Sequence, residues 1–125
     1  NKLNKLRRDA IREFDKLSLD NMRKCLRLFG VKSDDLSNEL VESTLFTMVD
    51  KNPKKFFDKW VDNKSKDTEF IIEEAVAKGV IRKDKTNYYY GTDLIATSLA
   101  EAITYLDNKK NQDLKLVIIN ETNNK

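Results

Sequence analysis

The chain has no histidine among its 125 residues, one cysteine, one proline and three glycines. Without histidine, a catalytic triad, a general base or a zinc ligand set built on imidazole is excluded. The single cysteine, Cys25, excludes an internal disulfide. So few glycines and prolines leave little turn chemistry for a large sheet. We therefore expect a mainly helical protein that is not an enzyme, with no metal, no cofactor and no small-molecule substrate.

Long apolar runs are also missing. No stretch approaches the ~20 apolar residues that span a bilayer, and residues 1–8 lack the apolar core of a signal peptide. We expect no membrane partner and, with one free cysteine, a reducing cytoplasmic location. Because residue 1 is Asn rather than Met, we also expect a processed product or part of a larger protein.

Charge is abundant, and each sign is gathered into blocks along the chain. The net charge of +3 is made up of +6 (residues 1–32), −5 (33–50), +4 (51–66), −4 (67–77), +3 (78–85), −3 (86–108) and +2 (109–125). A DNA-binding domain usually gathers its basic excess on one face. Alternating blocks instead favour attraction between helices or toward a partner.

Apolar residues recur at helical spacing through most of the sequence. Residues 1–30 predict an amphipathic basic helical arm that ends at Gly30, and Ser33 followed by two aspartates predicts the start of a helix over 33–50. Asn52 and Pro53 are typical of the start of a further helix, over 53–62. The apolar residues of 114–119 fit either a helix or a strand.

Between two later helical segments, residues 80–90 predict a short β-hairpin that ends in three tyrosines. The predicted fold is mainly α: a compact bundle of about five or six helices with one short hairpin, the domain covering residues 31–120 and a frayed tail covering 121–125. A helix followed by a hairpin is also typical of a winged helix. The helix before this hairpin carries Asp67, Glu69, Glu73 and Glu74, which phosphate would repel.

Several stretches carry a resemblance to a known group of proteins. Residues 68–81 read TEFIIEEAVAKGVI, and YYYG (88–91), AITYL (102–106) and KNQDLK (110–115) follow. Over about residues 67–118 the chain resembles modules of virion or replication proteins of large AT-rich tailed bacteriophages, crAss-like phages among them. The resemblance implies a structural or assembly role in a phage-type protein, located in the virion or the host cytoplasm. It assigns no role to any residue.

Our leading hypothesis is a non-enzymatic helical module for protein interaction or assembly. It binds a protein partner or a second copy through the N-terminal arm and the hairpin. The partner-binding residues are apolar side chains and the arginines that steer association: Leu3, Leu6, Phe14, Phe29, Arg7, Arg8 and Arg12.

The alternative hypothesis is a nucleic-acid-binding accessory domain of winged-helix character. Its contacts are lysines of the 53–62 helix together with cations and tyrosines of the hairpin: Lys54, Lys55, Lys59, Arg82, Lys83, Lys85, Tyr88, Tyr89 and Tyr90. In that hypothesis the tyrosines stack on bases and the cations neutralise phosphates.

Overall fold

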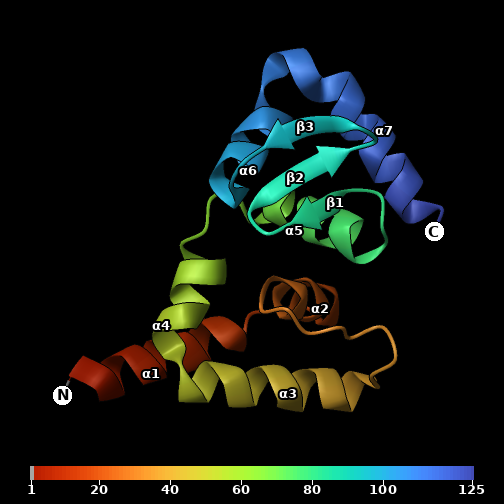
Figure 1. Ribbon diagram of the computed structural model, residues 1–125. Helices are drawn as coiled ribbons and strands as arrows, with labels where there is room; N and C mark the ends of the chain where they lie inside the picture. Colours follow the sequence, from red (N-terminus) through yellow and green to blue (C-terminus); the bar gives the residue numbers. More distant parts are fainter. Residues whose placement is uncertain (1) are drawn as a thin grey trace. The chain divides into compact units, whose positions relative to one another are not determined.

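The computed structural model describes residues 2–125 and confirms a mainly helical fold (Figure 1). Helices make up 66% of the chain, and the described residues form seven α-helices and one small antiparallel sheet of three strands. The predicted number of five or six helices is slightly low. The chain divides into two units, residues 2–66 and residues 67–125, and each is described by itself.

The first unit is built of helices alone among its described residues. Its elements are α1 (Lys2–Phe14), α2 (Leu19–Leu28), α3 (Asn38–Lys51), α4 (Pro53–Phe56) and a π-helical turn, η1 (Phe57–Val61). Helix α3 packs against α1, α2 and α4. Residues predicted as an arm therefore belong to the packed helices of this unit: Ala10 of α1 and both Cys25 and Leu26 of α2 are fully buried.

Helix α2 begins at a serine cap and ends before Gly30, the end that the sequence predicts. The Ser18 hydroxyl accepts a hydrogen bond from the Asn21 amide at 3.1 Å. At the other end Gly30 has a φ of +79°, and the amide of Val31 reaches back to the carbonyl of Leu26. This left-handed turn satisfies carbonyls of the last helical turn, and a glycine adopts it at little cost.

Helix α3 begins later than expected, so the assignment of Ser33 as its cap is wrong. The cap is Ser37, whose hydroxyl accepts from the Leu40 amide at 3.2 Å. Ser33 is buried, and its carbonyl accepts hydrogen bonds from the Leu36 amide and from Arg23 of α2. Because these donors engage Ser33, the chain turns there before α3 begins.

Asn52 and Pro53 start α4 as predicted, and the Asn52 side chain accepts from the Lys55 amide at 3.2 Å. The predicted 53–62 helix, however, is α-helical only to Phe56 and continues as η1. Phe56 is fully buried and Trp60 is 6% exposed. Both aromatic rings therefore belong to the core of this unit.

The second unit combines helices with the sheet. Its elements are α5 (Lys66–Ala77), β1 (Arg82–Asp84), β2 (Asn87–Tyr90), β3 (Asp93–Ala96), α6 (Leu99–Asp107), a 3-10 turn η2 (Lys109–Asn111) and α7 (Gln112–Asn123). The strands lie in the order β1-β2-β3, each antiparallel to its neighbour. The predicted hairpin is present as β1 and β2, and β3 is an addition to it. Residues 114–119 are helical.

The core of the second unit lies between the sheet and its helices. Tyr88 and Ala96 are cross-strand neighbours and are buried with Ile72, Leu106 and Ile118. Thr122 near the end of α7 is also buried, and its hydroxyl donates to the Ile118 carbonyl at 2.7 Å. The helix thus extends into the segment predicted as a frayed tail.

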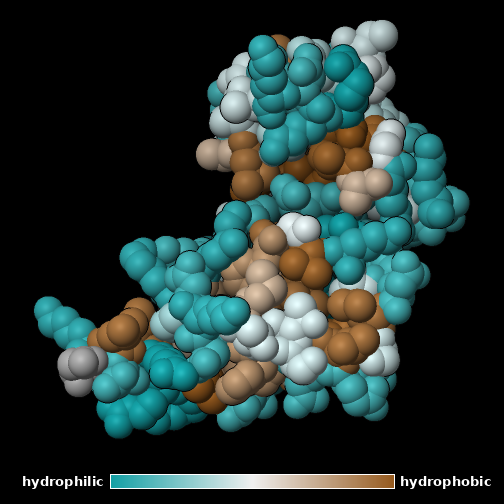
Figure 2. Space-filling view, turned by 60° about the horizontal axis from the view of Figure 1, so that its bottom comes forward, coloured by the Kyte–Doolittle hydropathy of each residue, from teal (hydrophilic) through white to brown (hydrophobic). Residues whose placement is uncertain are grey.

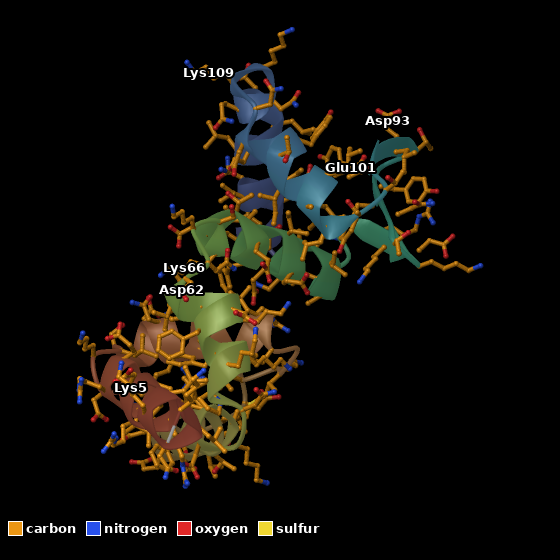
Figure 3. All side chains as sticks on the ribbon, turned by 90° about the vertical axis from the view of Figure 1, so that its left-hand side faces the viewer. Lys5, Asp62, Lys66, Asp93, Glu101 and Lys109 are labelled. Carbon is orange, nitrogen blue, oxygen red and sulfur yellow. The ribbon has the colours of Figure 1, made fainter. Side chains whose placement is uncertain are left out.

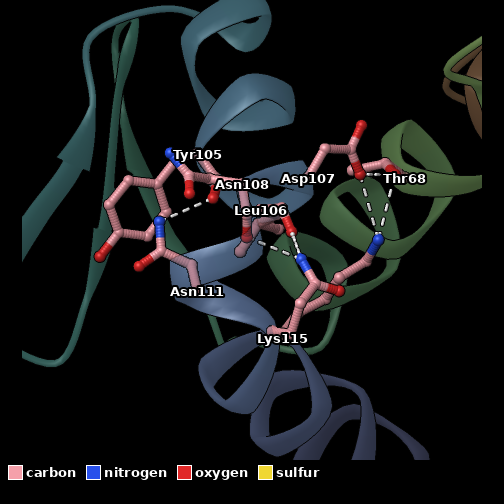
Figure 4. A network of polar contacts seen from close by, with 8 residues as sticks. Thr68, Tyr105, Leu106, Asp107, Asn108, Asn111 and Lys115 are labelled. Atoms are coloured by element: carbon pink, nitrogen blue, oxygen red, sulfur yellow. Dashed lines mark hydrogen bonds and ion pairs between the residues drawn. The ribbon is translucent and has the colours of Figure 1, made fainter.

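A network of polar contacts joins α5, α6 and α7 (Figure 4). The Thr68 hydroxyl donates to the Asp107 carboxylate at 2.6 Å, and Lys115 Nζ donates to the same oxygen at 3.1 Å. The Gln112 side-chain amide donates to the carbonyls of Leu106 and Asn108 at the end of α6. These contacts fix the turn between α6 and α7 and hold both helices against α5.

Candidate partner-binding surface

A hollow of about 540 Å³ lies between α1 and α3 in the first unit. Four residues of α1 and two of α3 line it: Asn4, Arg7, Arg8, Ile11, Phe46 and Asp50. We call these six residues the α1–α3 groove. Figure 2 shows apolar patches interspersed with hydrophilic side chains on one face of the molecule. The groove has this mixed character, because it combines two apolar side chains with three charged ones.

An ion pair crosses the groove from one helix to the other. Arg7 Nε donates to Asp50 Oδ1 at 2.5 Å, and the second guanidinium nitrogen donates to Oδ2 at 3.0 Å. The hydrogen bond from Arg7 lowers the pKa of Asp50, and the same bond raises the pKa of Arg7. Both groups are therefore charged at neutral pH, and the planar two-point contact fixes the spacing of α1 and α3.

Arg8, unlike Arg7, has no carboxylate partner within the described residues. Within residues 2–125 it makes no ion pair and no side-chain hydrogen bond. An apolar side chain on each of the two helices is open to solvent: Leu3 of α1 is 64% exposed and Phe46 of α3 is 39% exposed. Helix α1 carries five Lys or Arg and two Asp or Glu, so the α1 side of the groove is basic, whereas α3 carries three Asp or Glu and one Lys.

The other residues predicted to bind a partner differ in accessibility. Leu6 is half-buried, and Arg12 is exposed with one nitrogen 3.7 Å from Asp9. Phe14 is only 4% exposed and packs edge-on against Phe46 at 5.6 Å, so it is a core residue and cannot meet a partner. Phe29 is half-buried, and the Lys55 ammonium lies 5.1 Å from its ring centre. The exposed part of the predicted surface is thus Leu3, Arg7, Arg8 and Arg12, while Leu6 and Phe29 are half-buried.

The sequence analysis did not identify the residues that complete the groove. Phe46 and Asp50 lie four residues apart on α3 and therefore share one helical face. Phe46 also falls outside the stripe of α3 that holds Val41, Leu45 and Val49. An aromatic residue left off the buried stripe, with a charge one turn later, is the signal that would have found them.

The hairpin residues of the nucleic-acid hypothesis lie in the second unit. Arg82, Lys83 and Lys85 are exposed, and the Arg82 guanidinium lies 4.1 Å from the centre of the Tyr89 ring. Lys83 Nζ lies 5.6 Å from the centre of the Tyr88 ring. The cations are therefore available, and two of them cover aromatic rings of the next strand.

The three tyrosines do not form an open stacking platform. Tyr88 is 2% exposed, and Arg82 covers a face of Tyr89. The Tyr90 hydroxyl donates to Glu121 at 2.6 Å, and that hydrogen bond raises the pKa of Tyr90. Bases stack on exposed ring faces, so this arrangement gives the nucleic-acid hypothesis little beyond its cations.

The lysines of the nucleic-acid hypothesis lie apart from the hairpin in sequence, on α4 and η1 of the first unit. Lys54 pairs with Asp58 at 2.7 Å, and Lys55 lies against Phe29. Lys59 is half-buried. The hypothesis needs these lysines to meet phosphate, and Lys54 and Lys55 are already engaged with other side chains.

In the described part of the chain, no group of three or more His, Cys, Asp or Glu residues is placed to hold a metal ion, and no helix is both long and apolar enough to cross a membrane. No protein-family model matches the chain, and comparisons with curated proteins and with solved structures find no significant match.

Proposed function

We propose that the chain is a non-enzymatic interaction module whose α1–α3 groove binds an acidic amphipathic helix of a partner protein. The observation that carries this proposal is an unneutralised Arg8 together with an exposed Phe46 in the α1–α3 groove, with the exposed Leu3 in the first turn of α1. A helix laid along two packed helices places apolar residues at i, i+3, i+4 and i+7 into such a groove.

The positive charges of α1 favour a partner helix that carries carboxylates. The guanidinium of Arg7 is already engaged by Asp50, while that of Arg8 has no carboxylate partner within residues 2–125. A carboxylate on the incoming helix would supply one, with the planar geometry that arginine favours. The surplus of cations on α1 would also speed association with an acidic partner, in a way that salt weakens.

The apolar side chains supply the remaining contact. Ile11 and Phe46 are the apolar residues that line the groove, and the ring of the buried Phe14 packs edge-on against the Phe46 ring, with 5.6 Å between the ring centres. An aromatic ring held in place by the core loses little conformational freedom on binding. In a phage-type protein, such a module would join one component of an assembly to another.

The test is a titration of isotope-labelled protein with a synthetic helical peptide of about four turns, leucine on one face and glutamate on the flanks. We expect amide shifts to concentrate at residues 4–11 and 46–50. A second peptide with lysine in place of each glutamate is the matched probe, and we expect it not to bind. Shifts located elsewhere, or equal binding of both peptides, would refute the proposal.

A further inference from the structure

The sheet of the second unit has two outer strands. Because the order is β1-β2-β3, one edge of β1 and one edge of β3 have no strand partner among residues 2–125. Open edges present backbone donors and acceptors to other chains, and proteins commonly block them with charge. Both edges here are charged, and the charges have opposite sign.

The β1 edge is basic. Arg82 and Lys83 are exposed, as is Lys85 in the turn that follows, and none of these three makes an ion pair within residues 2–125. Asp84, the last residue of β1, is also exposed, so the strand and its turn carry three cations and one carboxylate. The β3 edge is acidic. Asp93 is exposed and likewise has no ion pair there, while Glu101 at the start of α6 accepts a hydrogen bond from the Thr97 hydroxyl. Figure 3 shows Asp93 at a corner of the sheet, Glu101 on the first turn of α6 and Lys109 beyond that helix.

A hollow of about 430 Å³ adjoins β3. Ile95 lines it from the strand, and Ala100, Glu101, Thr104 and Tyr105 line it from one flank of α6. The hydroxyls of Thr104 and Tyr105 make no side-chain hydrogen bond within residues 2–125. In Figure 4 the Tyr105 ring lies on the side of α6 that faces the strands. The hollow therefore offers a carboxylate and two hydroxyls to a side chain that enters beside β3.

We propose that a second copy of this chain occupies the β3 edge with its β1 strand, so that copies join head to tail through their sheets. This inference concerns the second unit and does not depend on the α1–α3 groove. The charges decide the pairing. Two β1 edges would oppose net positive charge to net positive charge, and two β3 edges would oppose Asp93 to Asp93, whereas β1 against β3 brings a net positive edge to an acidic one.

Strand direction agrees with this pairing. Both β1 and β3 are antiparallel to β2, so they run the same way, and a copy displaced sideways along the ladder brings its β1 parallel to β3. Lys83 pairs with Tyr88 across the sheet, and Tyr88 pairs with Ala96, so the three side chains lie on the same face of the sheet. Tyr88 and Ala96 are buried, which identifies this face as the one that the helices cover. Lys83 of the incoming strand therefore lies on the face of the hollow, within reach of Glu101. Contacts of this kind are heterologous and lead to rings or filaments rather than a closed dimer.

The first test is sedimentation of the full chain over a range of concentrations, in salt from about 50 to about 500 mM. We expect the mean mass to rise with concentration at low salt and to fall in high salt. A chain that stays monomeric at every concentration and salt overturns the proposal.

The second test is a charge swap. Variant one carries Arg82→Glu and Lys83→Glu, and variant two carries Asp93→Lys and Glu101→Lys. Each variant alone has like charges at both edges, so we expect monomers. An equal mixture restores opposite charges at every contact, so we expect assembly to return. A mixture that stays monomeric, or a single variant that assembles as the wild type does, overturns the proposal.

Two controls keep the result specific. Lys32→Glu with Lys64→Glu changes the net charge as variant one does, but at exposed positions of the first unit, and should assemble like the wild type. Ala100→Arg fills the hollow and should block assembly as variant two does, while Ala77→Arg at an exposed site on α5 should not. If Ala100→Arg and Ala77→Arg assemble to the same extent, the hollow has no role in assembly. This comparison does not change Glu101, so it holds even if Glu101→Lys disturbs the start of α6.

Discussion

Arg7 of α1 and Asp50 of α3 hold each other in a two-point ion pair, 2.5 Å from Nε to Oδ1 and 3.0 Å from the second nitrogen to Oδ2. The two residues are 43 positions apart in the chain. Their contact defines the spacing of the helices on either side of the α1–α3 groove. It also gives the groove a pH dependence with a definite sign.

We expect Asp50→Asn to lower stability near neutral pH, because the substitution removes the carboxylate that Arg7 binds. The pKa of Asp50 is lowered by folding, so the ion pair stabilises the protein above the ordinary pKa of 3.8, and the contribution disappears as the pH falls through the lower folded value. Urea unfolding of both proteins between neutral pH and about pH 3 measures this. A stability gap that is constant over the whole range would contradict the assignment.

Phe14 and Phe46 are in contact, but they should respond differently to truncation. Phe14→Ala removes a ring that is 4% exposed and should cost about 3–5 kcal/mol, which is large for a small unit. Phe46→Ala removes a ring that is 39% exposed and should cost well under half as much. Thermal or denaturant unfolding of both variants checks the order, and equal losses would mean that Phe14 is not a core residue.

Thr68→Val should loosen the junction of α5, α6 and α7. Burial raises the pKa of Asp107, but hydrogen bonds from Thr68 and Lys115 outweigh it and leave the pKa lowered. Removal of the Thr68 hydroxyl should cost about 1–2 kcal/mol and move the pKa of Asp107 upward. Unfolding experiments and a carboxylate titration by NMR measure the two effects. Thr86→Val, at an exposed position of the hairpin turn, is the control and should change neither quantity.

Cys25 should be inert in the folded protein. Its side chain is fully buried, and burial raises the pKa of the thiol to about 12, so the thiolate fraction at about pH 8 is lower than for a free cysteine by a factor on the order of 10³. A thiol reagent should label it only as fast as the protein opens, and at once in denaturant. Immediate labelling of the native protein would show that α2 does not bury this residue.

Much of the fold could be predicted from the sequence because it depends on local signals. Gly30 and the pair Asn52 and Pro53 act within a few residues of their own position, and each lies where its chemistry predicts. The start of α3 could not be predicted this way. Ser33 and Ser37 can both cap a helix, but Ser37 is the cap, and the Ser33 carbonyl accepts a hydrogen bond from Arg23, ten residues earlier in the chain.

The features that could not be predicted from the sequence depend on contacts between residues that are distant in the chain. Strand β3 has only four residues, two exposed and two buried, so it lacks the alternation that marks a strand. The groove depends on Arg7 meeting Asp50, and the helical junction depends on Thr68 meeting Asp107, 39 residues away. The basic residues of α1 were identified from charge and spacing alone, whereas Phe46 and Asp50 became candidates only once α3 was placed beside α1. The resemblance to phage modules stays a prediction.

The most direct measurement of the proposed function is the affinity of wild-type and Arg8→Glu protein for the glutamate-flanked peptide and for its lysine-flanked counterpart. The proposal predicts that Arg8→Glu weakens binding of the glutamate peptide by roughly tenfold or more and gains affinity for the lysine peptide. Lys32→Glu, an exposed charge reversal outside the groove, should leave both affinities near those of the wild type. If Arg8→Glu binds both peptides as the wild type does, or if the wild type binds neither, the α1–α3 groove is not a site for an acidic helix.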